Sequence, residues 1–136
     1  LVLRPEGGEE VRLPWVVAAP ARGVSLLSEV ELVRTGPRVS DATPAVLSLV
    51  AGSVAGDPDP QIRPLALLEL RLLRDGEPLG TLVRRRELLP GRYTFGLTGR
   101  DASGAELSPG AYVVRVVAHP GDGTRRQVAE VPYRLP

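Results

Sequence analysis

Apolar and polar residues alternate along short runs of this chain, and glycine or proline bounds each run. In residues 24–34 one face carries Leu26, Ser28, Val30 and Leu32, and the other carries Glu29 and Glu31. In residues 45–54 Leu47 and Leu49 lie opposite Val46, Ser48 and Val50. A period of two residues is typical of strands that bury one face. The pattern therefore predicts a protein of short β-strands.

Residues 65–83 are predicted to form a hairpin. Leucines that would face inward alternate with charged residues that would face outward, in the order Leu68, Glu69, Leu70, Arg71 and Leu72. Asp75-Gly76 supplies a two-residue turn between the strands. Leucine and glutamate also favour helices, but the two-residue alternation and the Asp-Gly pair favour strands.

A repeated Pro-Gly-x-Tyr unit marks two further strands. The units are Pro90-Gly91-Arg92-Tyr93 and Pro109-Gly110-Ala111-Tyr112. Proline fixes its own φ, and glycine accepts the positive φ that follows in a type II turn. Both tyrosine rings are expected to pack inward with the hydroxyl near the rim, and Phe95 shares a face with Tyr93. Trp15 is the largest side chain expected in the core.

Three further segments complete the predicted set of elements. Residues 55–64 contain three prolines and are predicted to be the longest loop. Residues 83–88 are the one candidate for a short helical turn. Residues 125–135 form a last strand, which Pro132 restricts to a sheet edge because proline has no N–H. Seven to eight strands spaced about ten residues apart predict an all-β, antiparallel two-sheet sandwich, with residues 1–136 as a single domain.

Composition excludes several classes of function. The 136 residues carry a net charge of only +1, which gives no basic excess of the kind that nucleic-acid binders show. All 17 basic residues are arginine, which together with the absence of lysine and asparagine indicates a GC-rich genome. The absence of cysteine excludes disulfides and thiolate chemistry. No apolar run approaches the length of a membrane span. Because the chain starts at Leu1, we expect it to derive from a longer or processed protein.

Few residues offer chemistry. The single histidine, His119, precedes a proline and is expected to be exposed at a strand end. Asp57, Asp59 and Asp101 are weak calcium candidates, but aspartates beside glycine or proline are ordinary turn formers. The runs 84–86 and 125–126 are all arginine and could bind an anionic polymer, although a solvated edge is the favoured interpretation. No catalytic residue, resident metal or cofactor is predicted.

Residues 67–118 resemble the immunoglobulin-like module of flagellar hook-capping proteins. They share "LELRLLRDGEPLGTL" and "LLPGRYTFGLTGRDASGAELSPGAYVVRVVA", although "GLTGRD" stands where that family has a tryptophan motif. The whole chain, from "VRLPWVVA" through "LLPGRYTFGLTGRD", is more specifically similar to the region that follows the catalytic domain of exported actinobacterial-type subtilisin-like serine proteases. This resemblance implies an immunoglobulin- or fibronectin type III-like sandwich. The catalytic Asp, His and Ser of that family lie in another domain, and no position here matches them.

The resemblance implies a non-catalytic accessory domain of a secreted bacterial protease, located outside the cell or at its surface. Such a domain would stabilise or dock the enzyme, or contact substrate or cell wall. Its partner would be a catalytic domain of the same polypeptide or another protein, without nucleic acid or membrane insertion. The alternative is a structural assembly module of a surface appendage or scaffold. A polysaccharide-binding module is a third hypothesis.

The tyrosine doublet yields the first testable prediction. If Tyr93 and Tyr112 anchor the core, Tyr93→Ala and Tyr112→Ala each lower the free energy of unfolding by about 3 kcal/mol or more, since a large ring is lost from a packed site. Urea unfolding followed by circular dichroism measures the change. If the free energy of unfolding is unchanged by the substitution at either position, that tyrosine does not anchor the core.

Overall fold

The computed structural model describes residues 2–3, 11–12, 25–56 and 58–136, and this part of the chain contains strands and no helix. Trp15 lies outside the described residues. Eleven strands are present in the described part, more than the seven or eight expected, because four of them are only two or three residues long. The short strands are β1 (Val2–Leu3), β2 (Val11–Arg12), β5 (Ser53–Ala55) and β6 (Gln61–Arg63).

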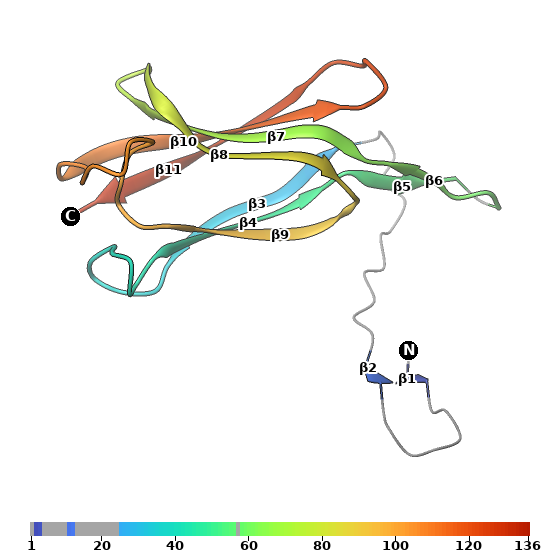
Figure 1. Ribbon diagram of the computed structural model, residues 1–136, viewed down its shortest axis with the longest axis horizontal. Coiled ribbons are helices and arrows are strands. Elements are labelled where there is room, and N and C mark those ends of the chain that lie inside the picture. The colour runs from blue at the N-terminus through green and yellow to red at the C-terminus, as the bar shows by residue number, and fades with distance from the viewer. Residues whose placement is uncertain (1, 4–10, 13–24, 57) are drawn as a thin grey trace.

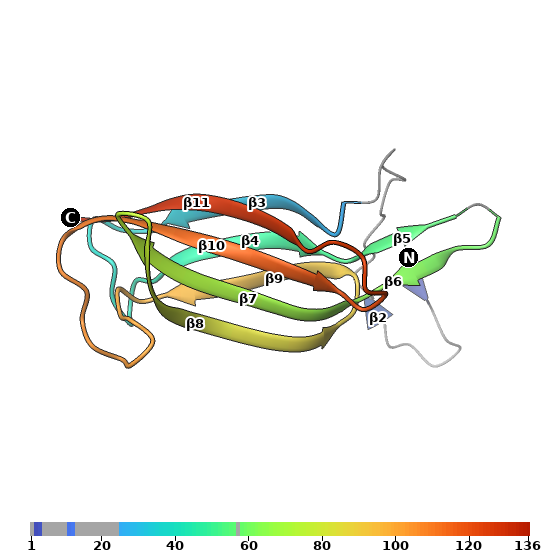
Figure 2. The ribbon, with the colours of Figure 1, turned by 90° about the horizontal axis from the view of Figure 1, so that it is seen from above.

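Seven longer strands form two antiparallel sheets. One sheet has the order β11-β10-β7-β8 and the other the order β3-β4-β9. Their bounds are β3 (Leu27–Arg34), β4 (Ala45–Ala51), β7 (Leu65–Arg74), β8 (Glu77–Leu88), β9 (Gly91–Leu97), β10 (Gly110–Pro120) and β11 (Gln127–Leu135). The two sheets lie as two layers (Figure 1), and the view from above shows the order of the strands in the four-stranded sheet (Figure 2). The all-β, antiparallel prediction is confirmed as a sandwich-like fold.

Aliphatic side chains fill the space between the layers. Residues with no exposed surface alternate along the three inner strands, namely Leu47 and Leu49 of β4, Leu68, Leu70 and Leu72 of β7, and Val114 and Val116 of β10. The inward positions predicted for Leu68, Leu70 and Leu72 are therefore confirmed. In residues 46–50 the inward face is the one that carries Leu47 and Leu49. The hairpin is confirmed as well, because Asp75 and Gly76 both have positive φ, 51° and 82°, as a type I′ turn requires.

In the described residues, hydrogen bonds join the two sheets along the side of the sandwich where β3 and β11 lie. The backbone N–H of Leu26 donates to Gln127 Oε1 at 2.9 Å, and an Arg34 guanidinium N–H donates to the Arg134 carbonyl at 3.3 Å. These contacts link the two ends of edge strands β3 and β11, which lie side by side in both ribbon views (Figures 1 and 2). Pro132 lies on β11, an edge strand as predicted. On the other long side the edges are β8 and β9.

Both tyrosines of the doublet reach back to the carbonyl four residues earlier. The Tyr93 hydroxyl donates to Leu89 O and the Tyr112 hydroxyl to Ser108 O, each at 2.7 Å. Tyr112 is buried, whereas Tyr93 and Phe95 are partly buried against the core, as predicted for inward-facing rings.

The glycines of the doublet do not form the type II turns that were predicted. Gly91 has no positive φ, and Gly110 has a φ of 150° rather than about 80°. Both glycines are instead the first residues of strands β9 and β10. The loops beside Pro90 and Pro109 are closed by tyrosine hydroxyl groups, so no type II turn is needed there.

Two other predictions were wrong. Residues 83–88 belong to strand β8, not to a helical turn, because pairing with β7 satisfies their backbone groups and overrides a weak helical preference. The proline-rich segment 55–64 is not all loop. Ser53–Ala55 pairs with Gln61–Arg63 in a small hairpin, and its prolines stand in the turn and just after the second strand.

Gly52 is the point where three segments meet. It has a φ of 72°, and its N–H donates to Leu26 O at 2.9 Å. A Cβ built there would lie 2.9 Å from both Arg63 O and the Pro90 Cα. Only glycine fits this contact between the β5–β6 hairpin and the turn before β9.

We therefore expect Gly52→Ala to destabilise the protein by about 2 kcal/mol or more, through strain at positive φ together with backbone overlap. Gly76→Ala is the matched control, because Gly76 also has a positive φ, 82°, but no atom lies within 4 Å of a built Cβ. It should cost only about 1 kcal/mol. Chemical denaturation compares the two variants, and equal losses would show that the close contact at Gly52 carries no energy.

Candidate functional site

The outer face of the four-stranded sheet carries cross-strand rows of arginine, glutamate and apolar side chains. Antiparallel partners share a face, so the register defines these rows. They are Arg86, Leu67 and His119; Arg84, Glu69, Val117 and Val128; Arg71, Arg115 and Glu130; and Leu73, Val113 and Pro132. We call this surface the arginine face.

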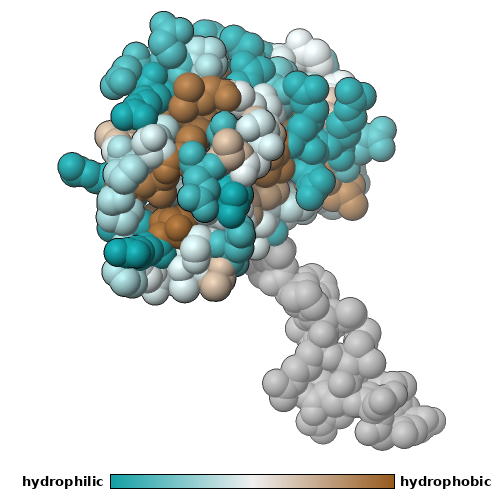
Figure 3. Space-filling view, turned by 60° about the vertical axis from the view of Figure 1, so that its left-hand side comes forward, coloured by the Kyte–Doolittle hydropathy of each residue, from teal (hydrophilic) through white to brown (hydrophobic). Residues whose placement is uncertain are grey.

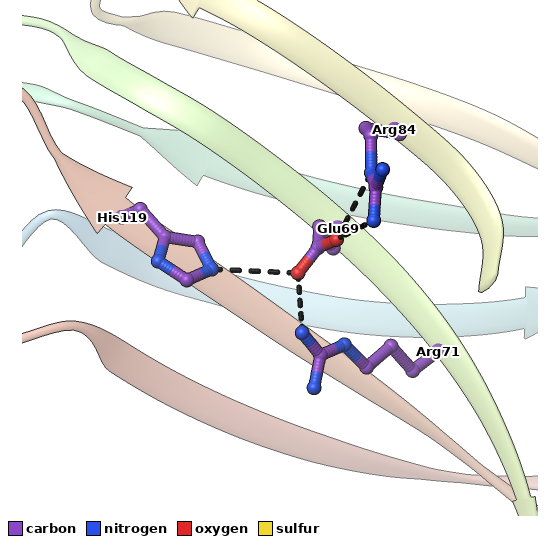
Figure 4. Close-up of polar contacts among 4 residues, drawn as sticks. All are labelled: Glu69, Arg71, Arg84 and His119. Carbon is purple, nitrogen blue, oxygen red and sulfur yellow. Dashed lines mark hydrogen bonds and ion pairs between the residues drawn. The ribbon is translucent and has the colours of Figure 1, made fainter. Parts of the chain in front are cut away.

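Glu69 is the buried centre of the arginine face (Figure 4). Its Oε2 accepts a hydrogen bond from Arg71 Nη2 at 2.5 Å, and its Oε1 accepts from Arg84 Nε and Nη2 at 3.0 and 2.6 Å. The Nε2 atom of His119 lies 3.4 Å from Oε2. Only 3% of the Glu69 side chain is exposed. Glu69 shares the outward face with Arg71, as predicted, but the neighbouring side chains cover it.

The two arginines hold Glu69 ionised. The hydrogen bond from Arg71 is the largest cause, and together with Arg84 it lowers the pKa of the carboxyl from 4.5 to about 2, against the opposing effect of burial. Both carboxylate oxygens already accept hydrogen bonds from arginine. A carboxylate so engaged is a poor general base near neutral pH, because its proton affinity is low and its lone pairs are occupied. Its effect is to orient two guanidinium groups on the surface.

The side chains of this cluster come from elements that the sequence predicted only in part. His119 is the second-to-last residue of β10, at a strand end as predicted, but its side chain is only 31% exposed. Arg84, Arg85 and Arg86 are exposed on the edge strand β8, which is consistent with a solvated edge. Sequence reasoning missed that Arg84 pairs with Glu69. Counting outward from the Asp-Gly turn would set Glu69 opposite Leu82. Two β-bulges shift the register by two residues and bring Arg84 there instead, so the sequence offered no local signal for this pair.

The calcium candidates do not come together in the described residues. Asp57 lies outside them, and Asp59 is exposed in the turn between β5 and β6, at the opposite end of the sandwich from the loop that contains Asp101 (Figure 1). Asp101 Oδ1 accepts from Ser103 Oγ, Ser103 N and Ala105 N, at 2.6, 2.8 and 3.0 Å. The Ser103 hydroxyl is the largest cause of a lowered pKa for Asp101. Throughout the described ranges no three histidine or acidic side chains form a metal-binding group.

A hollow of about 450 Å³ lies at the end of the sandwich that carries the C-terminus. Apolar side chains are visible between hydrophilic ones at this end (Figure 3). Val39, Leu107 and Leu135 contribute to the lining, and Arg100 lies 3.4 Å from Asp41 and 3.6 Å from Glu106. Arg100 also donates to Gly104 O at 3.0 Å. Its contacts join the β3–β4 and β9–β10 loops, so Arg100 has a structural role here.

Comparison with family models, with curated proteins and with solved structures finds no match to this chain. Across the residues that the structure describes, no helix is long and apolar enough to cross a membrane.

The Glu69 cluster predicts a specific pH dependence. Because the folded-state pKa of Glu69, about 2, lies below its unfolded value of 4.5, its stabilisation is fully present above pH 4.5 and is lost as the pH falls through about 2. Glu69→Gln should lower the free energy of unfolding at pH 7 by about 1–2 kcal/mol, a value reduced because water reaches both arginines. In the Glu69→Gln variant, the loss of stability that protonation of Glu69 causes below pH 4.5 should also be absent.

Glu130→Gln is the control, since Glu130 lies on the same face but is 48% exposed and pairs with one arginine. Its effect should stay within about 0.5 kcal/mol. Thermal unfolding between about pH 2 and 7 measures all three proteins. If Glu69→Gln follows the wild-type pH curve, the buried pair does not stabilise the sheet.

Proposed function

We propose that this chain is a non-catalytic accessory domain of an exported bacterial subtilisin-like serine protease, which it stabilises or docks onto a partner. The proposed fold is an immunoglobulin- or fibronectin type III-like sandwich. The observation that carries the docking role is the arginine face, where Glu69 fixes Arg71 and Arg84 on the surface of the sheet. Arginine is enriched at protein interfaces, where its fork-shaped guanidinium adds affinity and orientation.

The order of the strands supports the proposed fold. In constant-type immunoglobulin domains the fourth strand joins the sheet of the first, second and fifth strands. Here the fourth long strand, β8, pairs with β7 in the sheet that also contains β10 and β11. This strand order supports the fibronectin type III-like form of the proposed sandwich, with the β5–β6 hairpin as an insertion between the second and third long strands.

The Tyr112 contact also supports it. Immunoglobulin-like sandwiches carry a tyrosine near the start of the sixth strand whose hydroxyl bonds to the backbone a few residues upstream. Tyr112 is the third residue of β10, the sixth long strand, and its hydroxyl donates to Ser108 O. Its ring packs beside Tyr133, with a centroid separation of 6.4 Å, and the Arg74 guanidinium lies over it at 5.2 Å.

The proposal predicts that the isolated chain does not hydrolyse casein or a chromogenic peptide, and that its open reading frame encodes a subtilisin-like domain. In the polypeptide produced from that frame, removal of residues 25–136 should lower the thermal stability of the protease or its retention at the cell surface. Its kcat on a small peptide should change little, because the proposed domain lies outside the active site.

Three results would overturn the proposal. They are turnover by the isolated chain that a serine-protease inhibitor blocks, a reading frame without a protease domain, and a truncated enzyme with unchanged stability and surface retention. Light scattering that shows an obligate ring or filament would favour the structural assembly module instead.

A further inference from the structure

We propose that the arginine face binds a carboxylate side chain of an acidic partner polypeptide between Arg71 and Arg115. This inference rests on the docking role proposed above and names the chemistry of the partner. The rows of the sheet bring the two arginines together, since Arg71 of β7 and Arg115 of β10 are direct cross-strand partners. The Cβ atoms of such partners lie about 4.5–5.5 Å apart.

Neighbouring charged side chains on the arginine face have opposite signs, except where Arg71 lies beside Arg115. Arg84 pairs with Glu69, Glu69 pairs with Arg71, and Arg115 pairs with Glu130. Within the described residues no carboxylate bridges Arg71 and Arg115. Two like charges placed directly opposite each other are unfavourable. An external carboxylate at this position would complete the alternation and relieve the repulsion.

Both arginines have N–H groups to offer. A guanidinium has five donors, and within the described residues Arg71 uses one on Glu69 at 2.5 Å while Arg115 uses one on Glu130 at 2.6 Å. Their side chains are 37% and 40% exposed. The two carboxylates therefore hold the arginines in place without using up their donors. Little side-chain entropy would be lost when a ligand binds.

Apolar residues surround the two arginines on the same face. Val117 and Leu73, in the rows on either side, are nearly buried, at 2% and 4% exposure, and Val128 is 49% exposed. Apolar neighbours limit hydration and strengthen a charge-assisted hydrogen bond. The surface thus combines arginine, which is enriched at protein interfaces, with apolar side chains beside it.

Charge complementarity favours an acidic partner. The arginine face holds four arginines, Arg71, Arg84, Arg86 and Arg115, against two glutamates, a net of +2, whereas the whole chain has +1. A modest charge mixed with apolar side chains fits a carboxylate on a folded or extended polypeptide. A surface that binds nucleic acid or a sulfated polysaccharide would need a larger excess of basic residues.

The test is an NMR titration of the ¹⁵N-labelled chain with a synthetic peptide that alternates glutamate and leucine. At low ionic strength, amide shifts should concentrate on the central residues of β7 and β10, and binding should weaken steeply as NaCl rises from about 20 to 200 mM. A peptide with glutamine in place of glutamate should produce no such shifts.

Arg115→Gln tests the site itself, because it leaves the buried Glu69 cluster intact. We expect it to weaken binding of the glutamate peptide at least about tenfold, with Arg115→Lys intermediate because it keeps the charge but loses the fork. Arg92→Gln is the matched control, since Arg92 is an exposed arginine of the other sheet that is also paired with a glutamate, Glu29. It should bind like the wild-type protein.

The proposal is overturned if the wild-type chain does not bind the glutamate peptide, if Arg92→Gln weakens binding as much as Arg115→Gln, or if the shifts lie on another surface. Tighter binding of a heparin fragment or a DNA oligonucleotide at the same residues would also overturn the choice of partner. These measurements use the chain alone, so their failure is distinguishable from failure of the proposed protease association, which the reading frame and the truncated enzyme test.

Discussion

The contact between the two sheets is the interaction on which the rest of the molecule depends. With a single phenylalanine and three tyrosines in the chain, leucine and valine supply most of this layer. The interlocking of β4 with β7 and β10 therefore fixes the separation and the twist of both sheets. The inner strands position the edge strands and the loops. Because their inward side chains are fixed in the core, every second side chain must point outward.

One consequence of that layer is a sheet with two distinct faces. The inward residues of β7 are leucines, whereas Glu69 and Arg71 lie on its other side with their cross-strand neighbours. A carboxylate is costly to bury unless it is fully hydrogen-bonded. Glu69 meets that condition through Arg71 and Arg84, so the outer face is ordered as well as charged. Side chains that are already oriented lose less entropy when a partner binds, which supports the docking role proposed above.

The sequence predicted those parts of the fold that depend on local patterning. Two-residue alternation located β3, β4, β7, β9 and β10, and the Asp75-Gly76 pair located the hairpin turn. The sequence pattern did not predict that residues 83–88 form a strand. Arginine, glutamate and leucine have no strong local preference for strands, so the pairing with β7 decides their structure. Residues 61–63 are a similar case, since proline neighbours suggested a loop and partners at 53–55 made a strand.

The candidate site was less predictable than the fold for a related reason. The alternation of apolar and polar residues predicts on which face of a sheet a residue lies. It does not predict whether long side chains from adjacent strands cover that residue. Glu69 was correctly assigned outward, yet it is covered by arginines 2 and 15 positions away in the sequence. Arg71 and Arg115 are 44 positions apart in the sequence and become neighbours only when β7 and β10 pair in the folded sheet.

The link between β3 and β11 has a mechanical consequence. The two strands run side by side in the same direction, with the start of β3 at one end of the sandwich and the end of β11 at the other (Figures 1 and 2). Tension applied between Ser25 and Pro136 would pull β3 and β11 past their partners β4 and β10 along the strand axis. Antiparallel ladder hydrogen bonds stand perpendicular to that axis, so many of them would share the load at once rather than break one after another. The domain would therefore resist stretching along its length better than peeling from the β8 and β9 side.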